Sequence, residues 1–563
     1  MSGFFSRERI IAPADFNRWK VPPASIAIHL CIGSVYAWSV FNPPLMKVRG
    51  VVASAAGDWS LTQVTWVFTA AIVSLGLSAA VAGRWMERVG PRTVGMVAAC
   101  CWGSGLIVSA SGIWLRQLTL LYLGYGVLGG IGLGLGYVSP VSTLIKWFPD
   151  RRGMATGLAI MGFGGGAMIA APLNEALIRH FYQPPEYVGS EAALKLTTDQ
   201  HGVRFAEVDG RRREVVVVGA GDVSKMIVPG PPGVYLVGTG RVGVAEAFAA
   251  LGAGYFLVMT LAALSYRLPA FDWRPAGWSP PSGQAAAQKM ISLKHVAVES
   301  ALQTPQFYLL WLMLCLNVTA GIAVLGVAKT MMTDMFAPTL PQIVTAAFAT
   351  AYVQMTSASN MAGRFFWSSV SDTLGRKRTY TIFFVAGAAA YLSIPWIAGR
   401  FAASADAAWL ALFYGVTMLI FTMYGGGFAT IPAYLADLFG SRHVAAIHGL
   451  LLTAWSTAGV LGPIAITSLR ERAVHRAIRQ LAAVVGSEHF ENKFGAPASE
   501  LPALIESNTV TISKLMEIAP AGTVDPSSSL YNSTMYLMTG LLVVALVANL
   551  LVSPVEEKHH LDE

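Results

Sequence analysis

The sequence predicts an all-α membrane protein with twelve transmembrane helices, arranged as two related halves of six helices each. Of its 563 residues, 54% are hydrophobic and only 12% are charged, whereas about 25% of the residues of soluble proteins are charged. Stretches of about 20 mostly apolar residues, enough to cross a hydrocarbon core of ~30 Å, recur along the whole chain. Landmark residues of the first half also recur at matching positions in the second.

The apolar stretches fall into two groups of six around one polar segment. They cover approximately residues 22–42, 62–82, 93–112, 117–145, 152–178, 244–266, 306–332, 342–369, 379–398, 407–434, 445–468 and 532–553. We therefore predict an N-terminal half over 1–266, a central cytoplasmic loop over 267–305 and a C-terminal half over 306–563. Proline, phenylalanine and glycine positions of 140–172 recur in 432–463, which indicates a duplicated six-helix unit, typical of transporters whose halves move around a central site.

The charges of the short loops predict the orientation. Basic residues gather in the loops after the second, fourth and eighth stretches. They are Arg84, Arg88, Arg92, Lys146, Arg151, Arg152, Arg376, Lys377 and Arg378. The loops on the other side offer little beyond Arg116, Lys329 and Arg400. Because cytoplasmic loops collect Lys and Arg, we expect both termini in the cytoplasm and a multi-pass protein of the plasma (inner) membrane. The first twenty residues have no cleavage site of a signal peptide.

Two long polar inserts occupy equivalent positions on the predicted outer face, over residues 179–243 and 469–531. The first contains β-rich runs at 214–219 and 233–238, which predict a small hairpin. The second is partly helical in character, over 470–485. Two interpretations stay open at this point: the inserts pack together as an outer cap, or they are independent flexible loops.

A charged and glycine-containing motif follows the second stretch and recurs 285 residues later, after the eighth. Its first copy consists of Gly83, Glu87, Arg88, Gly90 and Arg92, and its second of Asp372, Gly375 and Arg376. The pattern resembles the signature loop of the major facilitator superfamily, which implies the fold of that superfamily. The acid can pair with arginines and a helix end and so act as a gate; a purely topogenic role of the charges is the alternative. Glu87 and Pro91 depart from the usual pattern.

Further motifs resemble the oxalate/formate antiporter family, which includes monocarboxylate carriers. They are Gly-Ser-Val-Tyr-Ala-Trp-Ser-Val-Phe at 33–41, Gly-Tyr-Val-Ser-Pro at 136–140, Asn-Met-Ala-Gly-Arg at 360–364, Tyr-Gly-Gly-Gly-Phe at 424–428 and Leu-Thr-Ala-Trp at 452–455. The resemblance covers the membrane part of the chain and leaves out the two inserts.

Arg364 is the strongest candidate for a substrate-binding residue. It lies eight residues before Asp372, about 12 Å along a helix and thus near the middle of the bilayer. A charge there is costly and indicates a function, and a guanidinium matches a carboxylate with two parallel hydrogen bonds. Asn360, one turn earlier, can add a further hydrogen bond. The resemblance implies the same role for both residues; the alternative is that Arg364 reaches the cytoplasmic interface or ties helices together.

The resemblance also implies aromatic groups around the anion, at Tyr137, Tyr424 and Phe428, with ordinary packing as the alternative for each. The oxalate exchanger of the family has a lysine after Thr-Ala in the eleventh helix, where this chain has Trp455. Because one fixed cation balances one carboxylate, the sequence favours a monoanion over a dianion.

Other kinds of site are not predicted. No Asp or Glu lies in the middle of a predicted span, and His29 is the one titratable group there that could take part in proton coupling, although a packed neutral histidine is the plainer interpretation. The four cysteines lie in apolar stretches without metal-ligand spacing. We expect no cofactor, no metal, no nucleic-acid partner and no enzymatic activity.

The sequence therefore predicts a secondary carrier of small monocarboxylates of the formate, lactate or pyruvate type, acting as a monomer in the lipid bilayer by alternating access. Exchange with a second anion is one possible mode. An oxalate/formate-type antiporter of dicarboxylates and a transporter-like membrane sensor are the alternatives.

Overall fold

The computed structural model describes residues 7–13, 15–198, 203–219, 223, 226–270, 273–278, 292, 294–494, 497–506 and 510–561. The chain divides into two compact units, Met1–Pro280 with Ser441–Ser456 and Pro281–Gly440 with Thr457–Glu563. Much of the predicted central loop, including Lys289, lies outside the described residues. The division into halves at 1–266 and 306–563 stays an interpretation of the sequence.

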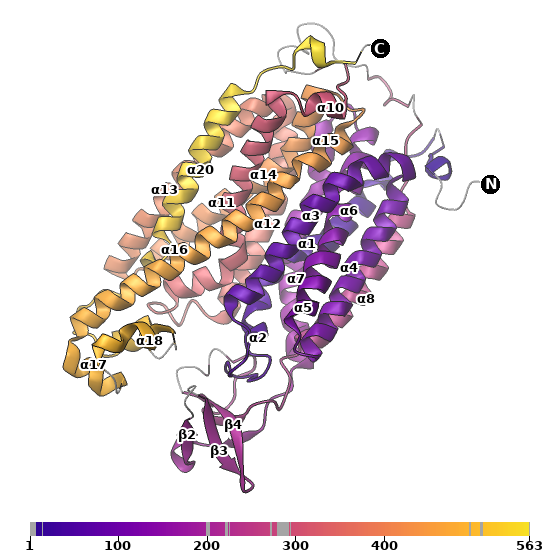
Figure 1. The fold of residues 1–563 in the computed structure, drawn as a ribbon. Coiled ribbons are helices and arrows are strands. Elements are labelled where there is room, and N and C mark those ends of the chain that lie inside the picture. Colours follow the sequence, from indigo (N-terminus) through magenta and orange to yellow (C-terminus); the bar gives the residue numbers. More distant parts are fainter. Residues whose placement is uncertain are drawn as a thin grey trace. The chain divides into compact units, whose positions relative to one another are not determined.

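The first unit is a helical bundle with a β insert (Figure 1). Its helices are η1 (Arg7–Ile10), η2 (Arg18–Lys20), α1 (Pro22–Gly33), η3 (Ser34–Val40), α2 (Asn42–Leu45), α3 (Leu61–Val89), α4 (Pro91–Trp114), α5 (Leu118–Leu121), η4 (Tyr122–Gly129), α6 (Gly130–Trp147), α7 (Arg152–Phe181), η5 (Glu191–Ala193), α8 (Val244–Leu264) and α15 (Val444–Leu451). Two of the predicted spans are irregular, because η3 is a 3₁₀ helix and η4 is a π helix.

The second unit is also a helical bundle (Figure 1). Its helices are α10 (Val298–Ala301), α11 (Pro305–Phe336), α12 (Ala346–Leu374), α13 (Arg376–Ser404), α14 (Ala407–Phe439), α16 (Thr453–Val485, whose first turn belongs to the first unit), α17 (Ser487–Phe494), η7 (Ala498–Glu500), α18 (Leu501–Glu506), α19 (Ile512–Met516), η8 (Pro526–Ser529), α20 (Asn532–Leu551) and η9 (Glu557–His559).

Within the described part of the chain, 11 helical segments are long and apolar enough to cross a membrane. The remaining long helix, α12, has 29 residues, and at ~1.5 Å per residue it is also long enough to span. It is poorer in apolar residues because Thr, Ser, Asn and Gln recur along it. The prediction of an all-α membrane protein with twelve transmembrane helices in two six-helix halves is confirmed. The long helix that falls outside the 11 apolar segments of the described chain, α12, is the one that carries Arg364.

Local sequence signals explain where several long helices begin and end. Ser60 and Gln63 form a capping box at the start of α3, in which the N–H of Gln63 donates to Ser60 Oγ and the N–H of Ser60 donates to Gln63 Oε1. Gly90 ends α3 and Gly375 ends α12 with φ of 84° and 91°. Side chains disfavour this left-handed region, so both copies of the motif need glycine at this corner.

Each unit pairs the segment before its first long helix with the segment after its last. In the first unit Ile11 forms a parallel bridge with Leu268, and in the second Val296 forms an antiparallel bridge with His560. Backbone hydrogen bonds from Ala12 to Leu268 and from Leu561 to His295, each 2.8 Å long, support the two pairings. The two pairings thus join the same parts of each unit but run in opposite relative directions.

The first insert is a five-stranded antiparallel sheet in the order β1-β5-β4-β3-β2. Its strands are β1 (Tyr187–Gly189), β2 (Leu196–Thr198), β3 (Arg204–Val208), β4 (Arg211–Val218) and β5 (Gly233–Leu236). The predicted hairpin is present as the β4–β5 pair, with Val216 opposite Tyr235. Val216, Val218 and Tyr235 pack against Val52 in the loop after the first span, and Glu214 pairs with Arg49 of that loop at 2.9 Å. The sheet is therefore anchored to the first unit.

The loop that receives the sheet is itself organised by one carboxylate. Asp58 accepts hydrogen bonds from the backbone N–H groups of Arg49, Gly50 and Ala55. Burial raises the pKa of Asp58, and these three donors together with the Arg49 charge oppose that rise.

The second insert begins as a direct continuation of α16, which confirms the predicted helix over 470–485. Arg470 binds Asp334 of α11 through Nη2 at 2.7 Å, and the hydroxyl of Tyr531 donates to the same carboxylate at 2.8 Å. Because Arg470 and Tyr531 stand at the two ends of the insert, this contact closes it at its base. Both inserts thus contain regular structure: the five-stranded sheet in the first, and the end of α16 with α17, α18 and α19 in the second.

Candidate functional site

Arg364 is buried in the second unit, with 0% of its surface exposed. Its Nε donates to Oδ1 of Asn360, one turn earlier on α12, at 2.8 Å. Its guanidinium carbon lies 5.0 Å from the ring centroid of Phe428 on α14, within the range of a cation–π interaction. The guanidinium is thus held between a neutral amide and an aromatic face.

Asn360 is also 0% exposed, and its Nδ2 has no hydrogen-bond acceptor among the described residues. Glycines 425 and 427 of α14 allow amide side chains to approach that helix. A Cβ at Gly425 would lie 2.6 Å from Oδ1 of Asn360, and one at Gly427 would overlap Nδ2 of Asn317 on α11. The glycine run in the motif at 424–428 therefore makes room for Asn360 beside Arg364.

Tyr424 and Phe428 lie on one face of α14, as their four-residue spacing predicts. Their ring centroids are 5.3 Å apart in an edge-to-face arrangement, and both side chains are buried. A Cβ at Gly321 of α11 would overlap the Tyr424 ring. In the second unit, Arg364, Asn360, Tyr424 and Phe428 thus form one connected group.

The other two predicted residues belong to the first unit and contact each other. The rings of Tyr137 on α6 and Trp455 are 5.3 Å apart, and both residues are 0% exposed. Phe163 of α7 completes a triangle with them, at 5.4 Å from Tyr137 and 5.2 Å from Trp455. Tyr36 packs on Phe163 at 5.0 Å. The predicted residues therefore form two groups, one in each unit.

Two buried histidines flank the Tyr137 ring. His29, considered from the sequence, lies 5.3 Å away between ring centroids, and His448 of α15 lies 6.1 Å away. His448 and Phe163 are not among the residues predicted from the sequence. His448 precedes Trp455 by seven residues, or two helical turns, and this spacing could have indicated it; Phe163 has no comparable local signal. Among the described residues, no group of three or more His, Cys, Asp or Glu side chains could hold a metal ion.

The first copy of the gating motif surrounds the corner between α3 and α4. Gly83 lies where α3 passes α15, because a Cβ there would lie 2.8 Å from the Cα of Ala446. Arg92 is buried and its Nη2 donates to the carbonyl oxygen of Tyr266 at 3.4 Å. Glu87 is half-buried and Arg88 is exposed.

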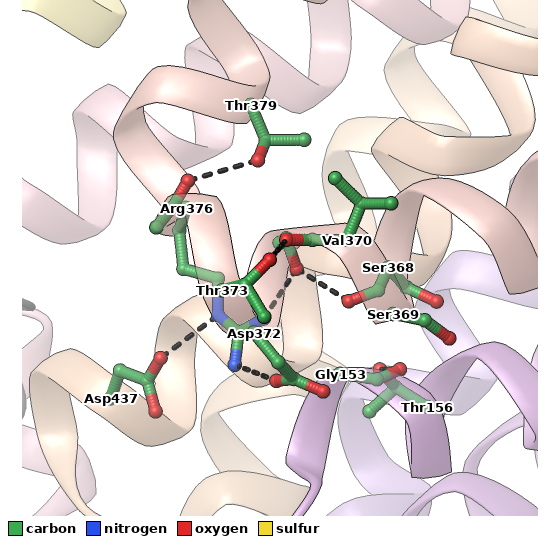
Figure 2. A network of polar contacts seen from close by, with 12 residues as sticks. Gly153, Thr156, Ser368, Ser369, Val370, Asp372, Thr373, Arg376, Thr379 and Asp437 are labelled. Carbon is green, nitrogen blue, oxygen red and sulfur yellow. Dashed lines mark hydrogen bonds and ion pairs between the residues drawn. The ribbon is translucent and has the colours of Figure 1, made fainter.

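The second copy contains a buried ion-pair network, which Figure 2 shows around Arg376. Arg376 binds Asp372 at 2.7 Å and Asp437 of α14 at 2.9 Å, and it also donates to the hydroxyl of Ser371. Only 6% of the Arg376 side chain and 7% of the Asp437 side chain are exposed. Asp437 was not among the predicted gating residues, because it follows Arg376 by 61 residues and only the packing of α13 on α14 brings them together. In the first copy Pro91 stands in the place of Arg376.

The chain resembles carboxylate transporters over most of its length. Residues 24–188 match the family model described as Major Facilitator Superfamily. The oxalate:formate antiporter of Oxalobacter formigenes is 25% identical over 461 residues, covering 79% of this chain and 83% of the antiporter. Apicoplast pyruvate carrier 1 of Toxoplasma gondii is 23% identical over 480 residues, covering 76% of this chain and 79% of the carrier.

A solved structure supports the fold independently. The bacterial homolog of the human lysosomal transporter Spinster superposes with a TM-score of 0.51 at 14% identity, covering 95% of this chain and 96% of the homolog. The resemblance inferred from the motifs is confirmed: residues 24–188 match the Major Facilitator Superfamily model, and the chain has the fold of the solved transporter homolog.

Proposed function

We propose that the chain is a secondary carrier of small organic monocarboxylates, of the formate, lactate or pyruvate type, that works by alternating access. The observation that carries this proposal is the buried guanidinium of Arg364 beside the Nδ2 group of Asn360. A carboxylate can accept hydrogen bonds from both groups, and the charge-assisted bonds to a guanidinium are about twice as strong as neutral ones.

The aromatic residues can contact the part of a small organic acid that lies beyond its carboxylate. Tyr424 and Phe428 on one unit, and Tyr137 and Trp455 on the other, offer apolar ring faces with hydroxyl groups at two positions. Binding sites for small ligands are commonly lined in this way, with few polar groups that fix orientation. We propose these six residues as the substrate-binding set.

The charge of the site favours a monoanion. Arg364 balances one carboxylate, and a second carboxylate would have to be desolvated without a matching cation. At an effective permittivity of ~20 this costs a few kcal/mol, and each ~1.4 kcal/mol is tenfold in affinity. The similarity to the oxalate:formate antiporter makes a dicarboxylate exchanger the second candidate.

In this proposal the motif around Arg376 is the gate on the cytoplasmic side, and both termini face the cytoplasm. The carrier acts as a monomer in the plasma (inner) membrane, without a cofactor.

Replacing Arg364 by lysine tests the carboxylate contact. An ammonium group cannot reproduce the planar fork, and one charge-assisted hydrogen bond contributes about 1.5–3 kcal/mol. We therefore expect Arg364→Lys to lower kcat/KM for lactate uptake into proteoliposomes by about tenfold or more. Arg400→Lys, at an exposed position of α13, is the matched control and keeps normal uptake. Normal uptake by a folded Arg364→Lys variant would remove Arg364 from the site.

Competition between anions tests the charge argument. Oxalate should compete with labelled lactate about tenfold more weakly than formate or pyruvate does. Trp455→Lys should reduce this difference in affinity between oxalate and the monocarboxylates, because it adds a cation. Trp455→Leu removes the same ring contacts without adding a charge and should leave the difference unchanged. Tight binding of oxalate by the wild type would contradict the monocarboxylate carrier and favour the dicarboxylate exchanger.

Removing the buried Arg376 charge tests the gate. Arg376→Gln leaves Asp437 buried without its cation, at a cost of about 3–5 kcal/mol. We expect a lower melting temperature in detergent and impaired transport. Arg378→Gln, two residues later at an exposed position, should preserve both. If the two variants melt alike, the network around Arg376 does not stabilise this end of the unit.

A further inference from the structure

A basic surface lies on α16, beyond the part of the helix that we predict to span the membrane. The predicted span ends at residue 468, whereas α16 continues to Val485. At ~1.5 Å per residue, Arg472 and Arg479 lie about 6 and 17 Å past that end. Figure 1 shows α16 in orange continuing to the turn where α17 begins.

The arginines of this segment occupy one face of the helix. At ~100° per residue, Arg472, Arg476 and Arg479 fall within a sector of about 60°. All three are exposed. The residues at the opposite side, Ala477, Leu481 and Val485, are 4–6% exposed. The apolar face is therefore buried, while the basic face meets solvent. We call Arg472, Arg476 and Arg479 the arginine surface.

The three arginines of this surface differ from the neighbouring Arg470 in their ion pairing. Arg470 is bound to Asp334 and Tyr531 at the base of the insert. In the described part of the chain, none of the three residues of the arginine surface forms an ion pair. Glu471, exposed on the adjacent side of the helix, offsets only one of the charges. On this face of α16, three exposed positive charges thus stand beside one exposed carboxylate.

We propose that the arginine surface collects small carboxylate anions from solution and raises their local concentration on the predicted outer side of the carrier. This inference rests on the proposed function and extends it to the step that precedes binding. Surfaces of one charge sign raise the association rates of oppositely charged ligands by about tenfold or more when the field is strong. With a Debye length of ~8 Å at physiological salt, three charges act only locally, so we expect a smaller effect of about threefold.

The test is the triple variant Arg472→Gln, Arg476→Gln and Arg479→Gln. The matched control neutralises Arg211, Arg212 and Arg213, three exposed arginines on β4 of the first insert. Initial uptake of labelled lactate is measured in right-side-out and inverted membrane vesicles, at about 20 mM and about 500 mM salt, where screening is weak and strong.

We expect kcat/KM of the α16 variant to fall about threefold in right-side-out vesicles at low salt, through KM, with kcat unchanged. The difference should disappear at high salt, in inverted vesicles and in the β4 control. An equal loss in the β4 control, or a loss that persists at high salt, would overturn the inference.

A second arm separates dissolved anions from lipid headgroups. In proteoliposomes of pure phosphatidylcholine the difference should persist; if it appears only when phosphatidylglycerol is added, the surface binds headgroups and the inference is wrong. Absence of all carboxylate uptake by the wild type would contradict the proposed function itself. Uptake that is normal in both triple variants would contradict only the inference.

Discussion

The cost of placing a guanidinium inside a membrane helix shapes the centre of the second unit. Arg364 is completely buried on α12, where water cannot solvate its charge. The amide oxygen of Asn360 and the ring face of Phe428 stabilise the buried charge and so offset part of this cost. The absence of a side chain at Gly425 lets Asn360 stand against α14. The cost of burying this charge, and the packing around it, are the reasons why we propose Arg364 as a substrate-binding residue.

The same helix connects the proposed binding site with the proposed gate. Asp372 follows Arg364 by eight residues, about 12 Å along α12, and pairs with Arg376 just after the glycine corner. Arg376 in turn holds Asp437 at the end of α14, the helix that carries Tyr424 and Phe428. α12 and α14 thus meet at Arg364 and Phe428 and are linked again through Arg376 of α13. A shift of α12 against α14 caused by an anion at Arg364 would therefore strain the ion pairs around Arg376. In our proposal, a substrate bound at Arg364 would act on the ion pairs around Arg376 through these helices.

The sequence predicts the helical architecture well, because the hydrocarbon core dictates helix length and composition locally. It also predicts that Asn360 and Arg364, or Tyr424 and Phe428, share a helix face, since four-residue spacing settles that. Contacts between segments that are far apart in the sequence cannot be predicted in this way. No local sequence signal around Asp437 predicts its ion pair with Arg376. Likewise, none around Phe163 predicts its ring contacts with Tyr137 and Trp455. The sheet over 187–236 was foreseen only as a hairpin, because its outer strands are three residues long and their pairing depends on tertiary packing.

The account depends on whether the charge of a carboxylate is what the site recognises. Thermal stability of the purified protein in detergent, measured with lactate and with the neutral isostere lactamide, tests this most directly. If Arg364 binds a carboxylate, lactate raises the melting temperature, lactamide does not, and Arg364→Gln abolishes the effect of lactate. Equal stabilisation by the two ligands, or an undiminished effect of lactate on Arg364→Gln, would contradict it.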